Sequence, residues 1–164
     1  MNKSFIKYQV FVFVSVILIA VDQITKKLAL KHLFNNKPYV IIDNVLELTY
    51  VENRGAAFGI LKNKQKMFYI LTIIVLIVIC YLLYKMTDIK KNLLYFIVLI
   101  LIFSGAIGNF IDRLKNKYVI DFIYFKPIDF PVFNCADIYI TIACFLMIIY
   151  LILENKNEKG LIKG

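Results

Sequence analysis

Two aspartates in the second half of the chain lie among apolar residues, which is unusual for charged side chains. Asp121 sits within the run Val119-Ile-Asp-Phe-Ile123, and Asp137 comes directly before a long apolar segment. Ionisable groups in such surroundings are costly unless they have a partner or a function. An N-cap role at the start of a helix accounts for Asp137, but it leaves Asp121 unexplained.

Two carboxyl groups that a fold brings together cannot easily both ionise. At a separation of ~4 Å and an effective dielectric constant near 20, their repulsion is about 4 kcal/mol, or roughly three pKa units. One group then stays protonated while the other ionises. Such a pair can deprotonate a water molecule, let it attack an amide carbonyl, and supply a proton to the leaving nitrogen. If Asp121 and Asp137 meet, we expect aspartic peptidase chemistry.

Other reactive groups offer weaker alternatives. The three serines, Ser4, Ser15 and Ser104, do not lie in a nucleophile-elbow sequence, and Cys135 has no histidine near it in sequence. The single histidine, His32, stands among lysines without a second ligand at metal-binding spacing. The sequence also lacks a glycine-rich phosphate loop. We therefore expect neither a metal nor another cofactor.

The composition indicates an integral membrane protein. Of the 164 residues, 61% are hydrophobic and only 19% are charged, whereas soluble domains have about 45–50% apolar residues. The net charge is +9, and the basic residues flank apolar runs. We therefore expect anionic lipid headgroups, and not nucleic acid, to be the partner of these charges.

Four apolar runs are long enough to cross a membrane, and they predict an all-α membrane protein with a four-helix transmembrane bundle in a single domain, 1–153. The predicted spans are approximately 5–26, 67–84, 93–111 and 138–153. Four crossings place both long connections, about 27–66 and 112–137, on one side of the membrane. The other side of the membrane receives both termini and the short link 85–92. It also receives a polar tail at 154–164, which we expect to be disordered.

Polar residues gather on the side of the long connections, at or near the ends of the predicted spans. They are Asp22, Asn53, Arg54, Asn109, Asp112, Arg113, Asp121, Asn134 and Asp137. This gathering predicts that the protein works at that interface. Lys and Arg number eight on the side of the termini and twelve on the other side, so charge alone does not assign the cytoplasmic side, because long loops carry little weight in that rule.

Shorter patterns refine this scheme. Residues 39–52 alternate apolar and polar side chains around an Asp43-Asn44 turn, which predicts a small antiparallel sheet. The small residues of Asn53–Gly59 permit close backbone approach. Ser104 and Gly108 share a helix face and indicate helix packing. Asn109 lies on the same flank as Asp112 and Arg113, two charges that either mark the membrane interface or serve a site.

Five blocks of the chain resemble, in order and spacing, the signature blocks of bacterial lipoprotein signal peptidase (signal peptidase II), over roughly residues 10–153. The blocks are Asp22-Gln-Ile-Thr-Lys26, Asn53-Arg-Gly-Ala-Ala-Phe58, Gly108-Asn-Phe-Ile-Asp-Arg113, Val119-Ile-Asp-Phe122 and Phe133-Asn-Cys-Ala-Asp137. The resemblance implies an enzyme of the bacterial cell membrane with cytoplasmic termini, an extracytoplasmic sheet and an active site at the outer surface, and we expect it to be a monomer. It also implies substrates that are diacylglyceryl-modified prolipoproteins, cut just before the lipidated cysteine.

The same resemblance assigns roles to individual residues. Asp121 and Asp137 match the two catalytic aspartates, and Asp22 matches a residue that supports the fold or the site. Polar positions that line the site and hold substrate or carboxylate correspond to Asn53, Asn109, Arg113 and Asn134. The chain departs from the pattern in having no tryptophan, which members often carry between the catalytic blocks. An ion- or proton-coupled transporter and a non-enzymatic assembly factor are the alternatives, although the apolar middle of every span argues against the former.

Overall fold

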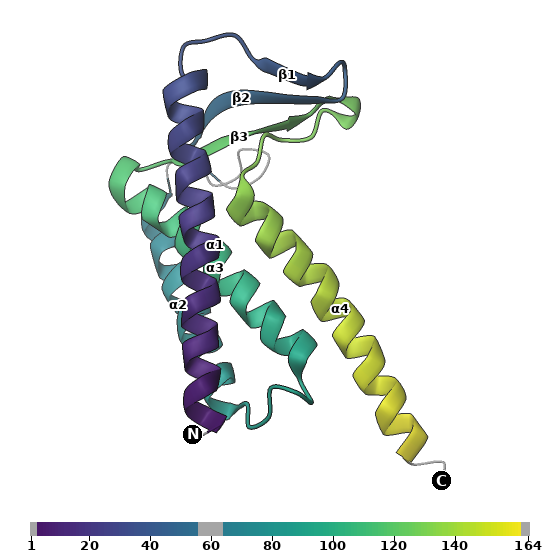
Figure 1. Ribbon diagram of the computed structural model, residues 1–164. Coiled ribbons are helices and arrows are strands. Elements are labelled where there is room, and N and C mark those ends of the chain that lie inside the picture. Colours follow the sequence, from purple (N-terminus) through teal and green to yellow (C-terminus); the bar gives the residue numbers. More distant parts are fainter. Residues whose placement is uncertain (1–2, 56–63, 162–164) are drawn as a thin grey trace.

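The computed structural model describes residues 3–55 and 64–161 (Figure 1). Its elements, in chain order, are α1 (Lys3–Leu33), β1 (Tyr39–Ile42), β2 (Leu46–Asn53), α2 (Gln65–Lys85), α3 (Leu93–Asn116), β3 (Val119–Phe125), a 3₁₀ turn (Lys126–Ile128) and α4 (Cys135–Leu161). Within the described residues, four helices are long and apolar enough to cross a membrane. The predicted four-helix transmembrane architecture with a small antiparallel sheet is confirmed.

Helix α3 is the central element of the bundle, because it packs against α1, α2 and α4. A buried cluster that includes Phe11, Ile79, Phe96 and Leu99 joins α1, α2 and α3. Large apolar side chains such as Phe13, at 68% exposure, cover the outside of the bundle, as expected for a surface that faces lipid. Figure 1 shows both termini at one end of the bundle and the sheet at the other.

A buried lysine closes the bundle at the end that carries the termini. The Lys7 ammonium group donates hydrogen bonds to the carbonyl oxygens of Leu83 and Met86, at 2.8 and 2.6 Å. Leu83 lies in the last turn of α2 and Met86 is its C-cap residue, where carbonyl groups have no partner within the helix. Lys7 thereby ties the start of α1 to the end of α2.

The helices extend beyond the apolar runs that predicted them. Helix α1 continues to Leu33 instead of ending near residue 26, because its last turns pack Ala29 and Leu33 against Ile120 and Phe122 of the sheet. Helix α4 reaches Leu161, so most of the polar tail that we expected to be disordered is helical. Hydropathy alone did not reveal these extensions, because they contain several polar and charged residues.

The sheet has the order β1-β2-β3, with both pairs antiparallel. The predicted hairpin of β1 and β2 is confirmed, and its turn contains Asn44 with a positive φ of 57°. Strand β3 was not predicted. Its first four residues are all buried, so it lacks the alternation that indicates a half-exposed strand.

Strand β3 brings distant parts of the chain together. It pairs with β2 so that Asp121 lies opposite Val51 and Val119 lies opposite Asn53. On its other edge, the backbone N–H groups of Phe122 and Ile123 donate to the Phe133 carbonyl oxygen, at 3.0 and 2.8 Å. The segment that leads into α4 is thereby held beside Asp121.

Close packing between α3 and α4 at Gly105 generates a first prediction. A Cβ atom at this position would lie 2.6 Å from the Ala136 carbonyl oxygen and 2.7 Å from Ile140. Alanine normally favours a helix over glycine by ~1 kcal/mol, but here it must displace the backbone at the start of α4. We expect Gly105→Ala to lower the free energy of unfolding by about 1–3 kcal/mol.

Thermal unfolding of the purified protein in detergent measures this effect. Leu114→Ala, at an exposed position near the end of the same helix, is the control and should change stability by less than ~0.5 kcal/mol. An unchanged or raised melting temperature for Gly105→Ala would show that α3 and α4 are not packed as closely as described.

Candidate active site

Asp121 lies on β3 with its carboxylate almost fully buried, at 1% exposure. Two asparagine side chains donate to it. Asn134 Nδ2 lies 2.6 Å from Oδ1, and Asn53 Nδ2 lies 2.9 Å from Oδ2. Asn53 is the last residue of β2, and its own Oδ1 accepts the Gly55 backbone N–H at 2.9 Å. Each carboxylate oxygen of Asp121 therefore has a neutral, oriented donor.

Asp137 lies in the first turn of α4. Its Oδ1 accepts a hydrogen bond from Asn109 Nδ2 at 2.8 Å, and its Oδ2 accepts the Asn134 backbone N–H at 3.2 Å. In return, Asn134 Oδ1 accepts the Asp137 backbone N–H at 3.0 Å. This reciprocal pair is a capping box in which Asn134 is the N-cap and Asp137 is the third residue of the helix. The N-cap role that we considered for Asp137 belongs to Asn134.

Asn134 and Asn109 join the two aspartates. Asn134 Nδ2 also lies 3.1 Å from Asn109 Oδ1, so a continuous chain of hydrogen bonds runs from Asp121 through the two amides to Asp137. Both carboxylates line one cavity of about 690 Å³. The structure therefore brings together the two aspartates that the sequence analysis paired.

Burial and charge set the protonation of Asp121. Removal from water, and then the negative charge of Asp137, raise the pKa of Asp121 from the ordinary 3.8 to about 7. Hydrogen bonds from Asn53 and Asn134 and the charge of Lys26 act in the opposite direction, because they stabilise the ionised form. A carboxyl group with a pKa near neutrality can both hold and release a proton under physiological conditions.

The cavity has one polar end and a long apolar wall. Asn53, Asn109 and Arg113 line its polar end together with the two aspartates. The apolar wall is formed by side chains of the three helices α2, α3 and α4, among them Phe68, Leu71, Val75, Ile102, Ile138 and Ile142. Such a cavity fits a ligand with a polar segment next to an apolar one.

Arg113 anchors the entrance to this cavity. Its Nη2 lies 3.3 Å from the Gly55 carbonyl oxygen, and its guanidinium group stacks over Phe68 at 4.5 Å from the ring centroid. The Arg113 carbonyl oxygen accepts the Tyr69 hydroxyl at 2.9 Å. The remainder of the block that begins at Asn53, namely residues 56–58, lies outside the described residues.

A buried cation lies behind the aspartates. Lys26, at 1% exposure, forms ion pairs with Asp22 at 2.9 Å and Asp112 at 3.2 Å, and it donates to Asn109 Oδ1 at 2.9 Å. Sequence reasoning did not assign a role to Lys26, although its spacing of four residues from Asp22 indicated a shared helix face. For Asp112, the sequence analysis left open whether the residue marks the membrane interface or belongs to the site.

The two acidic partners of Lys26 continue the network into the backbone. Asp22 Oδ1 accepts the Ala136 N–H at 2.9 Å, and Asp112 Oδ2 accepts the Ile120 N–H at 3.0 Å. These bonds hold the residues directly before Asp137 and Asp121. Asp22, within α1, therefore holds the backbone at the start of α4.

Other potential chemistry is sparse in the part of the chain that the structure describes. No group of three or more His, Cys, Asp and Glu side chains is arranged there to hold a metal ion. Cys135 is half-buried, with its Sγ 3.4 Å from the Thr25 hydroxyl oxygen. His32 and Ser104 do not line the cavity that contains the two aspartates.

Comparison with known proteins identifies this arrangement. A family described as signal peptidase (SPase) II matches residues 14–153. The chain belongs to the signal peptidase II family. It is 42% identical over 144 residues to the lipoprotein signal peptidase of Streptococcus agalactiae (serotype Ia), an overlap of 88% of this chain and 92% of the relative. Its identity to the enzyme of Enterococcus faecalis is 38% over 92% of both chains.

Solved structures agree with this membership of the signal peptidase II family. A bacterial membrane enzyme determined by the in meso method at 2.3 Å resolution superposes with a TM-score of 0.83 and 37% identity, over 91% of each chain. A second, at 1.9 Å resolution, gives a TM-score of 0.77 and 38% identity, over 87% of this chain and 92% of the other. The protein is therefore a multi-pass membrane peptidase, and neither alternative, a transporter or an assembly factor, is supported.

The buried lysine of this peptidase generates the second prediction. Lys26→Met removes the cation and leaves the carboxylates of Asp22 and Asp112 without it in a buried site. Breaking a buried ion pair in this way costs about 3–5 kcal/mol. We expect a loss of that size in the free energy of unfolding, measured by thermal or denaturant unfolding in detergent.

The double variant Lys26→Met/Asp22→Asn provides the control, because it removes one of the stranded charges. It should recover part of the stability lost in Lys26→Met, which a double-mutant cycle quantifies. Strictly additive losses would contradict the direct coupling of Lys26 and Asp22.

Proposed function

We propose that this signal peptidase II is an aspartic-type endopeptidase in which Asp121 and Asp137 are the catalytic residues. The observation that carries the proposal is a buried carboxylate, Asp121, and a partly buried one, Asp137, joined through Asn134 and Asn109 and lining one cavity. Asp121 has a pKa of about 7, and Asp137 lies at a helix N-terminus, where the dipole favours a negative charge. Asp121 holds the proton, and Asp137 is ionised.

Hydrolysis then follows two balanced steps. Asp137 takes a proton from water as the water oxygen bonds to the amide carbon, and Asp121 gives its proton to the carbonyl oxygen. When the carbon–nitrogen bond breaks, Asp137 returns its proton to the leaving nitrogen, and Asp121 recovers one from the tetrahedral carbon's hydroxyl. Both aspartates end in their starting states, and the reaction proceeds without a metal or a covalent intermediate.

The surrounding polar residues position this chemistry. Asn53 and Asn134 orient the carboxylate of Asp121, and Asn109 orients that of Asp137. Arg113 holds the backbone at Gly55 beside the cavity. Asp22 supports the start of α4.

The substrate is a prolipoprotein that already carries a diacylglyceryl group, and the enzyme cuts before the lipidated cysteine to release the signal peptide. Support comes from relatives that are lipoprotein signal peptidases and from a cavity whose apolar wall lies along three membrane-spanning helices. Acyl chains hold a lipidated cysteine at the membrane surface, which is the depth at which α3 ends and α4 begins.

We assign the sheet end of the bundle to the extracytoplasmic face of the bacterial cell membrane and both termini to the cytoplasm. Signal peptides span the membrane with their mature domains outside, so the scissile bond is delivered at the outer surface. A monomer suffices for the proposed chemistry, because the Asn53, Asn109 and Asn134 side chains that hold the two aspartates belong to the same chain as the aspartates.

The third prediction tests the catalytic pair. Asp121→Asn and Asp137→Asn each remove a proton-transfer group with little change in volume. Each should therefore reduce the cleavage rate by ~10²-fold or more. The measurement uses purified protein and a diacylglyceryl-modified prolipoprotein, with the released signal peptide followed by gel or mass spectrometry. Asp43→Asn, in the hairpin turn, is the matched control and should cleave normally. Near-normal cleavage by either Asp121→Asn or Asp137→Asn would contradict the proposed mechanism.

The fourth prediction concerns pH. Because Asp121 acts as the proton donor, cleavage should decline as the pH rises through the pKa of about 7. The Asn53 amide stabilises the ionised form of Asp121, so removing it raises the pKa. Asn53→Ala should therefore move the alkaline limb of the kcat/KM profile to higher pH, in addition to any loss of rate.

Arg54→Ala is the control for this shift, since Arg54 is the exposed neighbour and pairs with Glu52 at 2.9 Å. Its alkaline limb should coincide with that of the unmodified enzyme. A limb that stays in place in Asn53→Ala, or moves to lower pH, would show that Asp121 does not control the profile.

A further inference from the structure

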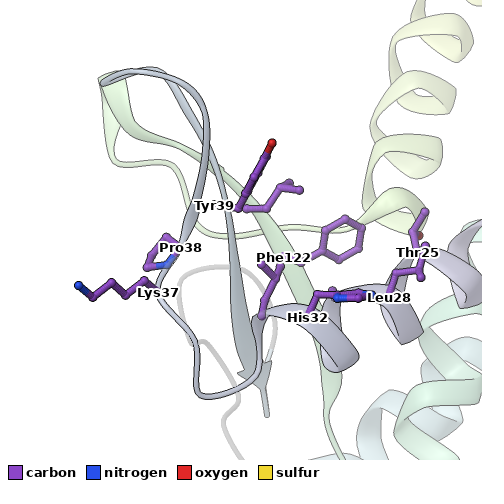
Figure 2. A pocket seen from close by; sticks show the side chains of 10 residues that line it. Thr25, Leu28, His32, Lys37, Pro38, Tyr39 and Phe122 are labelled. Atoms are coloured by element: carbon purple, nitrogen blue, oxygen red, sulfur yellow. The ribbon is translucent and has the colours of Figure 1, made fainter.

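A second cavity lies between the last turns of α1 and the sheet (Figure 2). It measures about 520 Å³ and shares no lining residue with the cavity that contains the two aspartates. Its helical wall includes Thr25, Leu28, Ala29 and His32. Their spacing of three and four residues places them on one face of α1. We call this space the α1–sheet cavity.

The α1–sheet cavity lies behind the strand that carries Asp121. Phe122 lines it, whereas Asp121 lines the active-site cavity. Successive side chains of a strand point to opposite faces, so the two cavities are separated by β3. Phe122 also packs in a buried cluster with Ala29 and Leu33. An occupant of this cavity would therefore contact the back of the catalytic strand.

The interior of this cavity is apolar, and its surroundings are basic. Lys37 and His32 are among its lining residues, and Figure 2 shows the Lys37 side chain extending outward, away from the other labelled residues. Lys27 and Lys31 are exposed on the same turns of α1. Between Asp22 and Asp43 the sequence contains no acidic residue. The matching ligand has an apolar body and an anionic head.

The position of the cavity relative to the membrane narrows the ligand class. The apolar run of α1 ends at Val21, and the helix continues to Leu33, which is about 18 Å further at 1.5 Å per residue. The α1–sheet cavity, whose helical wall runs from Thr25 to Leu33, therefore lies just beyond the apolar run, at the level of the headgroup layer. Thr25 is the lining residue nearest the apolar run, and Leu28, one turn further along, is half exposed.

We propose that the α1–sheet cavity binds one acyl chain of an anionic phospholipid, with the lipid phosphate attracted by the basic side chains around its mouth, Lys37 and His32 among them. Its volume falls within the ~300–1,000 Å³ of small-molecule sites. The bound chain packs against Phe122 and restrains β3 from behind. The diacylglyceryl group of a substrate carries no phosphate, so the basic mouth favours a membrane phospholipid over the substrate's own lipid.

The absence of tryptophan from the chain permits a direct test. Tyr39→Trp introduces one fluorophore at the cavity wall, and Leu30→Trp introduces one at an exposed position of α1 outside it. Each variant is placed in nanodiscs that contain a fixed fraction of chain-brominated phosphatidylglycerol or chain-brominated phosphatidylcholine. Bromine quenches tryptophan fluorescence on contact, so the readout is lipid occupancy and does not depend on catalysis.

We expect brominated phosphatidylglycerol to quench the Tyr39→Trp variant at least twofold more than brominated phosphatidylcholine, and the two lipids to quench Leu30→Trp equally. Adding Lys37→Gln and His32→Gln should abolish the preference, whereas Lys115→Gln, at an exposed position near the sheet end, should retain it. Equal quenching of Tyr39→Trp by both lipids, or a preference that survives Lys37→Gln with His32→Gln, would overturn the proposal.

Two competitors separate the possible sources of the ligand. Soluble glycerol phosphate should not relieve the quenching of Tyr39→Trp by brominated phosphatidylglycerol, because it lacks the acyl chain. A diacylglyceryl-modified prolipoprotein peptide should also leave it unchanged. Relief by glycerol phosphate would show a site for free phosphate, and relief by the lipopeptide would show a substrate site. Either result would overturn the assignment to a membrane phospholipid.

Discussion

The buried ammonium group of Lys26 is the interaction on which the rest of the site depends. It joins the carboxylates of Asp22 and Asp112 to the amide of Asn109, and each carboxylate passes the connection to a backbone N–H, at Ala136 and Ile120. One cation thereby ties α1, α3, β3 and α4 together. The buried carboxylates of Asp22, Asp112 and Asp121 and the partly buried one of Asp137 lie at one end of the bundle, where ionised groups repel one another strongly in a low dielectric. Lys26 offsets that repulsion, and its charge also lowers the pKa of Asp121.

Among the described residues, the side chains that donate hydrogen bonds to Asp121 and Asp137 are neutral amides. A lysine or arginine bonded to Asp121 would stabilise its ionised form and remove the proton that the proposed mechanism needs. Asparagine donors orient the carboxylate while shifting its pKa only moderately, so burial and the charge of Asp137 still raise it to about 7. The nearby guanidinium of Arg113 is instead directed to the Gly55 carbonyl oxygen and the face of Phe68. The positive charge of Arg113 therefore does not form a direct hydrogen bond with either Asp121 or Asp137.

The sequence predicted the features that depend on composition and short patterns, and it missed those that depend on tertiary contacts. Apolar runs located the four helices, and alternation with a turn located the hairpin of β1 and β2. Strand β3 was not predicted because it is buried on both faces, so its sequence lacks the alternation of apolar and polar residues that indicates a strand. The extension of α1 to Leu33 was not predicted because it depends on packing against Ile120 and Phe122, which are distant in sequence. The role of Lys26 was missed for the same reason, since its partners Asp112 and Asn109 are also distant in sequence. The interpretation of Asp137 as an N-cap failed by three residues, since Asn134 fills that position.

The contrast between the two ends of the bundle explains why the chemistry lies beside the sheet. At the end that carries the termini, the buried cation of Lys7 donates to the carbonyl oxygens of Leu83 and Met86 and lies over the Tyr8 ring, and among the described residues it forms no ion pair with an acidic side chain. At the sheet end, helix termini coincide with a strand that crosses them, and the backbone N–H groups of Ile120 and Ala136 hold carboxylates in fixed positions. The apolar wall along α2, α3 and α4 meets this polar end in one cavity. In the mechanism proposed above, an amide bond held where this wall ends meets both water and the two carboxylates, so the depth at which α3 ends and α4 begins would determine where a membrane-anchored substrate is cut.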